Sequence, residues 1–183
     1  MLYYIQKICI IILAVTPFYL IIRKPWRRKA EGWAGIKREV FLAAFVLFHA
    51  GLLVLALWGE YDTPAHMAQR AAERMESGEK INLVPFRTMS GFSMRKDMDA
   101  FMVNIVGNIV MFMPWGFGNV LLWKRRRNVW AVICCSSLLP LLIEVSQLFI
   151  ERSVDVDDFI LNFTGSCLGA VLFFLLKKRF WRE

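Results

Sequence analysis

Residues 144–162, EVSQLFIERSVDVDDFILN, place five acidic residues and one arginine between two long apolar runs. An acidic side chain at the centre of a membrane-spanning segment costs about 2.5 to 3.5 kcal/mol on insertion scales, so such a residue usually faces a polar interior and marks a functional site. The apolar runs on both sides predict membrane helices. The charged stretch between them therefore predicts a polar site at one end of a helix bundle.

The composition of the 183-residue chain indicates a membrane protein. Hydrophobic residues make up 57% of the sequence and charged residues only 21%, which is far from the balance of a soluble domain. The formal net charge of +8 comes from Lys and Arg residues that cluster just beyond apolar runs, as in the loops that set membrane orientation. This pattern excludes nucleic acid as the partner and indicates membrane lipids instead.

Five apolar stretches are long enough to cross a bilayer, which takes about 20 residues in a helix. The predicted spans are residues 2–22, 40–58, 101–123, 129–150 and 159–176. The fold class is therefore all-α, a polytopic membrane helix bundle of about five transmembrane helices that forms a single membrane domain. We assign this domain to residues 1–183.

Basic clusters predict the orientation of these helices. They follow the first span, occupy residues 124–127 between the third and fourth spans, and follow the fifth span. Because Lys and Arg are in excess on the cytoplasmic side of membrane proteins, all three clusters are expected inside the cell. The N-terminus is then outside, the C-terminus is inside, and residues 59–100 lie on the outer side with the acidic stretch.

The outer loop contains two recognisable segments. Asp62 or Thr63 is placed to cap a helix that has Pro64 at its first position and ends at Ser77 and Gly78. We expect this amphipathic helix to lie on the bilayer or on the bundle. The NLVPF segment at 82–86 follows, and forms either a plain loop or a strap across the outer mouth of the bundle.

Polar side chains of the predicted helices fall at a similar depth below the outer surface. Asn104 and Asn108 share one face of the third span, and Glu144, Gln147 and Glu151 share one face of the fourth. At 1.5 Å per residue, Glu144 lies about 9 Å below the outer end of its span and Asn108 about 10 Å below its own. The candidate binding-pocket residues are Asn104, Asn108, Glu144, Gln147, Arg152, Asp155, Asp157, Asp158 and Asn162.

Each of these residues also has a structural interpretation. Amides bond between membrane helices, and Asp155 or Asp157 can cap the fifth helix while Arg152 neutralises a carboxylate. An arginine among carboxylates and amides at the rim of an apolar pocket can instead recognise a phosphate, a peptide-like amide or a divalent cation. The acidic loop lacks the spacing of an EF-hand, so we predict no metal site, and no motif identifies a cofactor.

Two other features of the predicted spans have structural interpretations. His49, mid-way along the second span, is expected to be a hydrogen-bonded interior histidine rather than a proton relay. Gly165 and Gly169 are four residues apart in the fifth span, and this spacing predicts close packing on a neighbouring helix.

Several short motifs follow one another across residues 82–169: NLVPF, then NIVGNIVMFMPWGF at 104–117, then the acidic stretch with its two following glycines. In this order they resemble the VanZ-like family. The resemblance implies a multi-span protein of the bacterial plasma membrane, from a family whose namesake is associated with resistance to teicoplanin-type glycopeptides. It implies no catalytic residues, so the candidates above carry over as motif positions.

Three hypotheses for the function follow. In the leading one, the outward-facing pocket engages a lipid-linked cell-wall precursor or a lipoglycopeptide, and so contributes to glycopeptide resistance or to maintenance of the cell envelope. In the second, a membrane enzyme uses Glu144, or residues 155–158 with a divalent cation, on a phosphate or amide of a lipid. No nucleophile with an adjacent base is evident, which favours binding. In the third, the protein is a scaffold whose polar groups only hold the bundle together.

Overall fold

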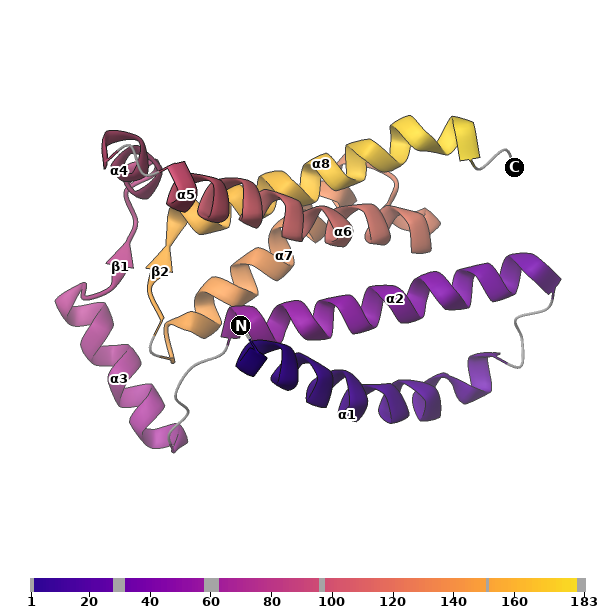
Figure 1. Ribbon diagram of the computed structural model, residues 1–183, viewed down its shortest axis with the longest axis horizontal. Helices are drawn as coiled ribbons and strands as arrows, with labels where there is room; N and C mark the ends of the chain where they lie inside the picture. The colour runs from indigo at the N-terminus through magenta and orange to yellow at the C-terminus, as the bar shows by residue number, and fades with distance from the viewer. Residues whose placement is uncertain (1, 28–31, 58–62, 96–97, 151, 181–183) are drawn as a thin grey trace.

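The computed structural model of the protein describes residues 2–27, 32–57, 63–95, 98–150 and 152–180 (Figure 1). Trp58, at the end of the second predicted span, and Glu151 lie outside the described residues. In chain order the elements are α1 (Leu2–Arg27), α2 (Gly32–Leu57), α3 (Pro64–Ser77), β1 (Ile81–Asn82), α4 (Arg87–Arg95), α5 (Met98–Phe101), η1 (Met102–Val106), α6 (Gly107–Leu122), η2 (Lys124–Arg126), α7 (Val129–Gln147), β2 (Val154–Asp155) and α8 (Val156–Phe180).

The membrane helix bundle predicted from the sequence is confirmed. Within the described ranges, four segments are long and apolar enough to cross a membrane: Gly35–Leu57, Met102–Leu122, Val129–Gln147 and Val156–Lys177. A shorter apolar helix, Ile12–Ile22, lies within α1. The fifth span and the orientation of the termini stay predictions.

The helices on either side of the acidic stretch have different bounds from the predicted spans. α7 ends at Gln147 rather than at residue 150, and residues 148–150 form turns. α8 begins at Val156 rather than at residue 159, with Asp157 and Asp158 in its first turn, where the helix dipole favours negative charge. Part of the predicted connecting loop is therefore the start of a helix.

Helices α6 and α8 pack backbone against backbone. A Cβ atom added to Gly116 would lie 1.6 Å from a backbone oxygen of α8. One added to Gly165 or Gly169 would lie 2.1 Å or 1.9 Å from a backbone oxygen of α6. Distances this short leave no room for any side chain, so the close packing predicted from Gly165 and Gly169 is confirmed, with α6 as the partner.

An apolar core joins α2, α6 and α7. Its buried residues are Leu52, Phe112, Leu139 and Ile143. His49 is buried on α2, and its Nδ1 atom lies 2.6 Å from the backbone oxygen of Phe45. The predicted hydrogen-bonded interior histidine is therefore confirmed.

Helices α3 and α4 and the two short strands gather at one end of the bundle. Figure 1 shows α3, β1, β2 and α4 at that end, while α8 runs away from them toward the C-terminus. Helix α3 has the predicted bounds: the Thr63 side chain accepts from the N–H of His66, Pro64 is the first residue, and Gly78 ends the helix with a φ of 70°.

Candidate functional site

Arg74 ties α3 to the end of α7. The side chain is buried, and its guanidinium group donates to backbone oxygens at the C-terminal end of α7 and just beyond it. These are the oxygens of Gln147 at 3.0 Å, Leu148 at 2.9 Å, Ile150 at 2.9 Å and Arg152 at 2.6 Å. A helix leaves its last carbonyl groups without partners, and a cation at this end also favours the helix dipole. α3 therefore lies on the bundle, and its Arg74 side chain caps the C-terminal end of α7.

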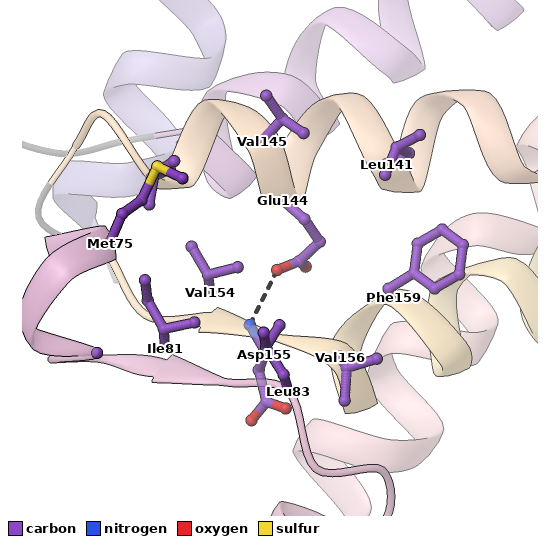
Figure 2. A pocket seen from close by; sticks show the side chains of 12 residues that line it. Met75, Ile81, Leu83, Leu141, Glu144, Val145, Val154, Asp155, Val156 and Phe159 are labelled. Carbon is purple, nitrogen blue, oxygen red and sulfur yellow. Dashed lines mark hydrogen bonds between the residues drawn. The ribbon is translucent and has the colours of Figure 1, made fainter. Parts of the chain in front are cut away.

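Residues 78–86, which we call the strap, pair with the segment before α8. β1 and β2 pair in parallel, and the N–H of Val154 donates to the backbone oxygen of Lys80 at 2.9 Å. The NLVPF segment is therefore part of a strap rather than a plain loop. The strap runs beside the ends of α7 and α8 (Figure 2).

Asp155 joins the strap, α4 and α8. Its Oδ1 atom accepts from the side-chain amide of Asn82 at 2.9 Å, and its Oδ2 atom accepts from the hydroxyl of Thr88 at 2.5 Å. Oδ1 also accepts from the N–H of Asp157 at 2.9 Å, which is the hydrogen bond of a residue that caps a helix N-terminus. The interpretation of Asp155 as a cap of the last helix is confirmed.

Asp157 holds the N-terminal end of α4. Its side chain is 1% exposed, and it accepts from the N–H groups of Phe86 at 2.5 Å, Thr88 at 2.8 Å and Met89 at 3.1 Å. Donors at a helix N-terminus suit a carboxylate, because their partial positive charge offsets the loss of water. Phe86 has a φ of 67°, which is rare for an aromatic residue, and the contact with Asp157 holds this conformation.

Glu144 has one oxygen without a hydrogen bond in the part of the chain that the structure describes. The side chain is 6% exposed, and Oε2 accepts from the N–H of Asp155 at 3.0 Å. Oε1 is buried and has no partner among the described residues. A buried acceptor without a donor costs about 1 to 3 kcal/mol, and more when it is charged. Such a group calls for an explanation, and a ligand is one.

A pocket of about 620 Å³ lies beside Glu144, between α3, the strap, α7 and the start of α8 (Figure 2). Its ionisable lining residues are Glu144 and Asp155, and its apolar walls include Met75, Leu83, Leu141, Val145, Leu148 and Phe159. Figure 2 shows Glu144 extending from α7 toward β2 with apolar side chains around it. An apolar cavity of about 300 to 1,000 Å³ with few polar groups is typical of a ligand site.

Gln147 and Arg152 contact the C-terminal end of α2 rather than this pocket. The side-chain amide of Gln147 donates to the backbone oxygen of Ala56 at 3.0 Å, and the guanidinium group of Arg152 donates to that of Leu55 at 3.2 Å. Both contacts occupy carbonyl groups in the last turn of a helix. These two candidates therefore join α2 to the region around α7, and neither lines the pocket beside Glu144.

The asparagine candidates are spread over α8, η1 and α6. Asn108 donates to Oδ1 of Asp158 at 3.0 Å, and this bond links α6 to the first turn of α8. Asn162 is buried on α8, whereas Asn104 is exposed on the π-helical turn η1. The structure brings Asn108 and Asp158 together, and none of these residues lines the pocket beside Glu144.

The carboxylates of this region mostly face N–H, amide and hydroxyl donors, as described above. Among the residues that the structure describes, no group of three or more His, Cys, Asp or Glu side chains is arranged to hold a metal ion. The feature of this region that suits a ligand is the Oε1 atom of Glu144, a hydrogen-bond acceptor beside an apolar pocket.

A family model described as VanZ/LLP1 matches residues 41–177. The match covers more than half of the chain and includes all the elements that line the pocket. The chain belongs to the VanZ/LLP1 family. No curated protein and no solved structure matches it.

Two residues that build this VanZ/LLP1 site are not among the sequence candidates. Arg74 follows the buried Ala71 by three residues, so it falls on the inner face of α3, and an arginine at that position of an amphipathic helix is a signal of a buried partner. Thr88 has no comparable signal, because its partner Asp155 lies far away in the sequence.

Proposed function

We propose that this VanZ/LLP1 member binds a lipid-tailed molecule in the pocket beside Glu144. The observation that carries the proposal is the pocket itself, with a volume of about 620 Å³ and mostly apolar walls at the end of the bundle that carries the strap. Through this binding, the protein contributes to glycopeptide resistance of the teicoplanin type or to maintenance of the cell envelope.

The walls of the pocket favour an apolar chain over a polar solute. Leu141, Val145 and Leu148 come from successive turns of α7 and its end, and Phe159 faces them from α8. A polar molecule in such a place would lose hydrogen bonds to water without replacing them, whereas a hydrocarbon chain loses none. The volume lies in the range of pockets that hold a small-molecule ligand.

The predicted orientation puts the pocket at the outer face of the membrane. The basic residues of η2 follow α6, after the chain has crossed the bundle away from the strap, and they are expected on the cytoplasmic side. The strap end then faces the outer leaflet. A lipid-linked cell-wall precursor and a lipoglycopeptide both carry an apolar tail that can reach a pocket in that leaflet.

A pair of matched tryptophan variants tests the occupied pocket. Val145 lines the pocket and is 50% exposed, whereas Leu142 is 53% exposed on the same helix and does not line it. The full-length protein in lipid vesicles is labelled with a fatty-acyl probe that carries a photoreactive group on its chain. We expect labelling of the pocket walls in the wild type and in Leu142→Trp, and much weaker labelling in Val145→Trp, because the indole takes up part of the cavity and leaves less space for the chain.

The same variants connect binding to the cellular role. Cells that depend on this protein for resistance should lose teicoplanin resistance with Val145→Trp and keep it with Leu142→Trp. Equal labelling of the two variants would show that the chain does not occupy this pocket. Incubation of the wild type with lipid-linked precursors, with and without a chelator, separates binding from catalysis, because chemical conversion of the lipid would replace the binding function by an enzymatic one.

A further inference from the structure

We propose that the ligand of this pocket carries a hydrogen-bond donor directly beside its apolar chain, and that this donor bonds to Glu144. The donor is an amide N–H, a hydroxyl or an ammonium group, and not a phosphate. The inference rests on the proposed function, because it names the polar end of the molecule that fills the same pocket.

The state of Glu144 is the first observation. One carboxyl oxygen, Oε2, accepts the N–H of Asp155, and the other, Oε1, is buried without a partner among the described residues. Because protein covers Oε1, a ligand reaches it when the carboxyl group turns about its terminal bond. A carboxyl oxygen that lacks a donor is satisfied by a ligand that supplies one, and a phosphate supplies only acceptors once it is ionised.

The charges around Glu144 also disfavour a phosphate. Asp155 and Asp158 lie near Glu144, and among the described residues Arg152 is the cation close to these carboxyl groups. Arg152 itself donates to the backbone oxygen of Leu55, outside the pocket. An anion beside Glu144 would therefore meet net negative charge, whereas a neutral or cationic donor would not.

One wall of the pocket is part of the surface that the protein presents to lipid. Leu141 and Val145 line the cavity and are also half exposed on the membrane-spanning segment of α7. Met75 and Leu83, on the opposite wall, are exposed as well. A chain can therefore enter sideways from the bilayer, between α7 and the strap, without crossing water.

This side entry makes the polar contact the source of selectivity. Lipid tails are as apolar as a leucine side chain, so a chain gains little when it moves from the bilayer into the pocket. Phospholipids surround such an opening in large excess. Glu144, beside the apolar wall, disfavours the phosphate group of a phospholipid. It favours an amphiphile that carries a hydrogen-bond donor next to its chain.

The test uses the full-length protein in phosphatidylcholine nanodiscs and four photoreactive probes with the same chain. The probes end in a primary amide, a hydroxyl, an ammonium group and a phosphate monoester. We expect the wild type to be labelled at the pocket walls about tenfold more by the donor probes than by the phosphate probe, since a hydrogen bond gained with one probe and lost with the other is worth about this much. The three donor arms then identify which donor the site prefers.

Glu144→Gln tests whether this carboxyl group is the origin of the preference. The amide keeps the size of the side chain and removes its charge, so we expect the ratio of donor to phosphate labelling to fall to about threefold or less. Leu142→Trp should keep the wild-type ratio, and the melting temperature of each variant shows that it is folded. The wild-type ratio alone tests the inference if Glu144→Gln does not fold.

Two outcomes separate the failure of this inference from the failure of the proposed function. Equal labelling of the wild-type pocket by the phosphate and donor probes overturns the inference and leaves lipid binding in place. Labelling of the pocket by none of the four probes overturns both. A wild-type ratio that Glu144→Gln leaves unchanged in a folded protein also overturns the inference.

Discussion

The middle and the N-terminal end of α8 pack in different ways. In the middle, Gly165 and Gly169 let the backbone of α6 approach directly, and the fit depends on the absence of side chains. At the N-terminal end, Asp155 and Asp157 hold the strap and α4 through hydrogen bonds to side chains and to backbone N–H groups. Close van der Waals contact between two backbones holds the first region together. Hydrogen bonds of polar groups around an open pocket hold the second.

This difference teaches how a membrane bundle can be rigid and still contain a binding site. Between helices in lipid there is little hydrophobic driving force, so close van der Waals contact through small residues is the main source of stability. At the strap end the segments are too short to pack in this way. Buried carboxylates and Arg74 provide the donors and acceptors that fix them, and space remains between α7 and the strap.

Gly116→Ala should have the largest effect, because it tests the region held by van der Waals contact. The added Cβ would lie 1.6 Å from the backbone oxygen of Ser166, so α6 and α8 must move apart. We expect a loss of at least about 3 kcal/mol in the free energy of unfolding, at the upper end of what overpacking costs. Gly107→Ala is the matched control, since nothing lies within 4 Å of its added Cβ. Equal melting temperatures in detergent would contradict the close contact.

Arg74→Met should have the next largest effect, because it removes the bonds that close α7. The carbonyl groups of Gln147, Leu148 and Ile150 would lose their donor, at a cost of about 2 to 4 kcal/mol. Amide hydrogen exchange should become faster in residues 148–155, while the α6–α8 contact stays protected. Arg87→Met, at an exposed position of α4, is the control. Unchanged exchange at 148–155 would mean that Arg74 does not hold this end.

Asp157→Asn should have a smaller and more local effect. One carboxyl oxygen becomes an NH₂ group that cannot accept from the backbone, so about 1 to 3 kcal/mol is lost at the start of α4. Exchange of the Thr88 and Met89 amides should become faster. Asp99→Asn, at an exposed position of α5, should leave it unchanged. A uniform change over the whole chain would argue against a local role.

Thr88→Val should have the smallest effect. It keeps the size of the side chain and removes two hydrogen bonds, the one that the hydroxyl donates to Oδ2 of Asp155 and the one that it accepts from the side-chain amide of Asn82. The Asn82 amide keeps its bond to Asp155, so we expect a loss of about 1 to 2 kcal/mol. The control is Thr164→Val, because the Thr164 hydroxyl donates to Ile160 of its own helix and should be nearly silent. A loss as large as that of Asp157→Asn would make Asp155, rather than Asp157, the main support of the strap.

Features that depend on neighbouring residues could be predicted from the sequence. The bounds of α3 follow from Thr63, Pro64 and Gly78, whose chemistry acts within one helical turn. The membrane helices follow from the length of apolar runs, and the spacing of Gly165 and Gly169 indicates close packing. The acidic stretch could also be predicted to be a polar site, because charged side chains next to membrane spans are costly and usually face a polar interior.

Features that join distant residues could not be predicted in this way. Asp157 accepts from the start of α4 as well as lying in the first turn of α8, and its partners are about 70 residues away in the sequence. Arg74 binds the end of α7 at a similar separation. Nothing in the local pattern selects these partners over others, because a carboxylate or a guanidinium group can bond to any exposed backbone group.

The sequence by itself determined that the chain is a membrane helix bundle of the VanZ-like type with an acidic stretch at one end, because apolar length and local spacing encode these features. The tertiary structure alone decided which acidic residues bond to other segments and which one keeps an acceptor without a partner among the described residues. Asp155 and Asp157 are engaged by the strap and α4, whereas Glu144 lines the cavity with one oxygen unpaired among the described residues. The physical reason is that the role of a carboxylate depends on which groups donate hydrogen bonds to it. These donors come from distant segments that fold onto one another.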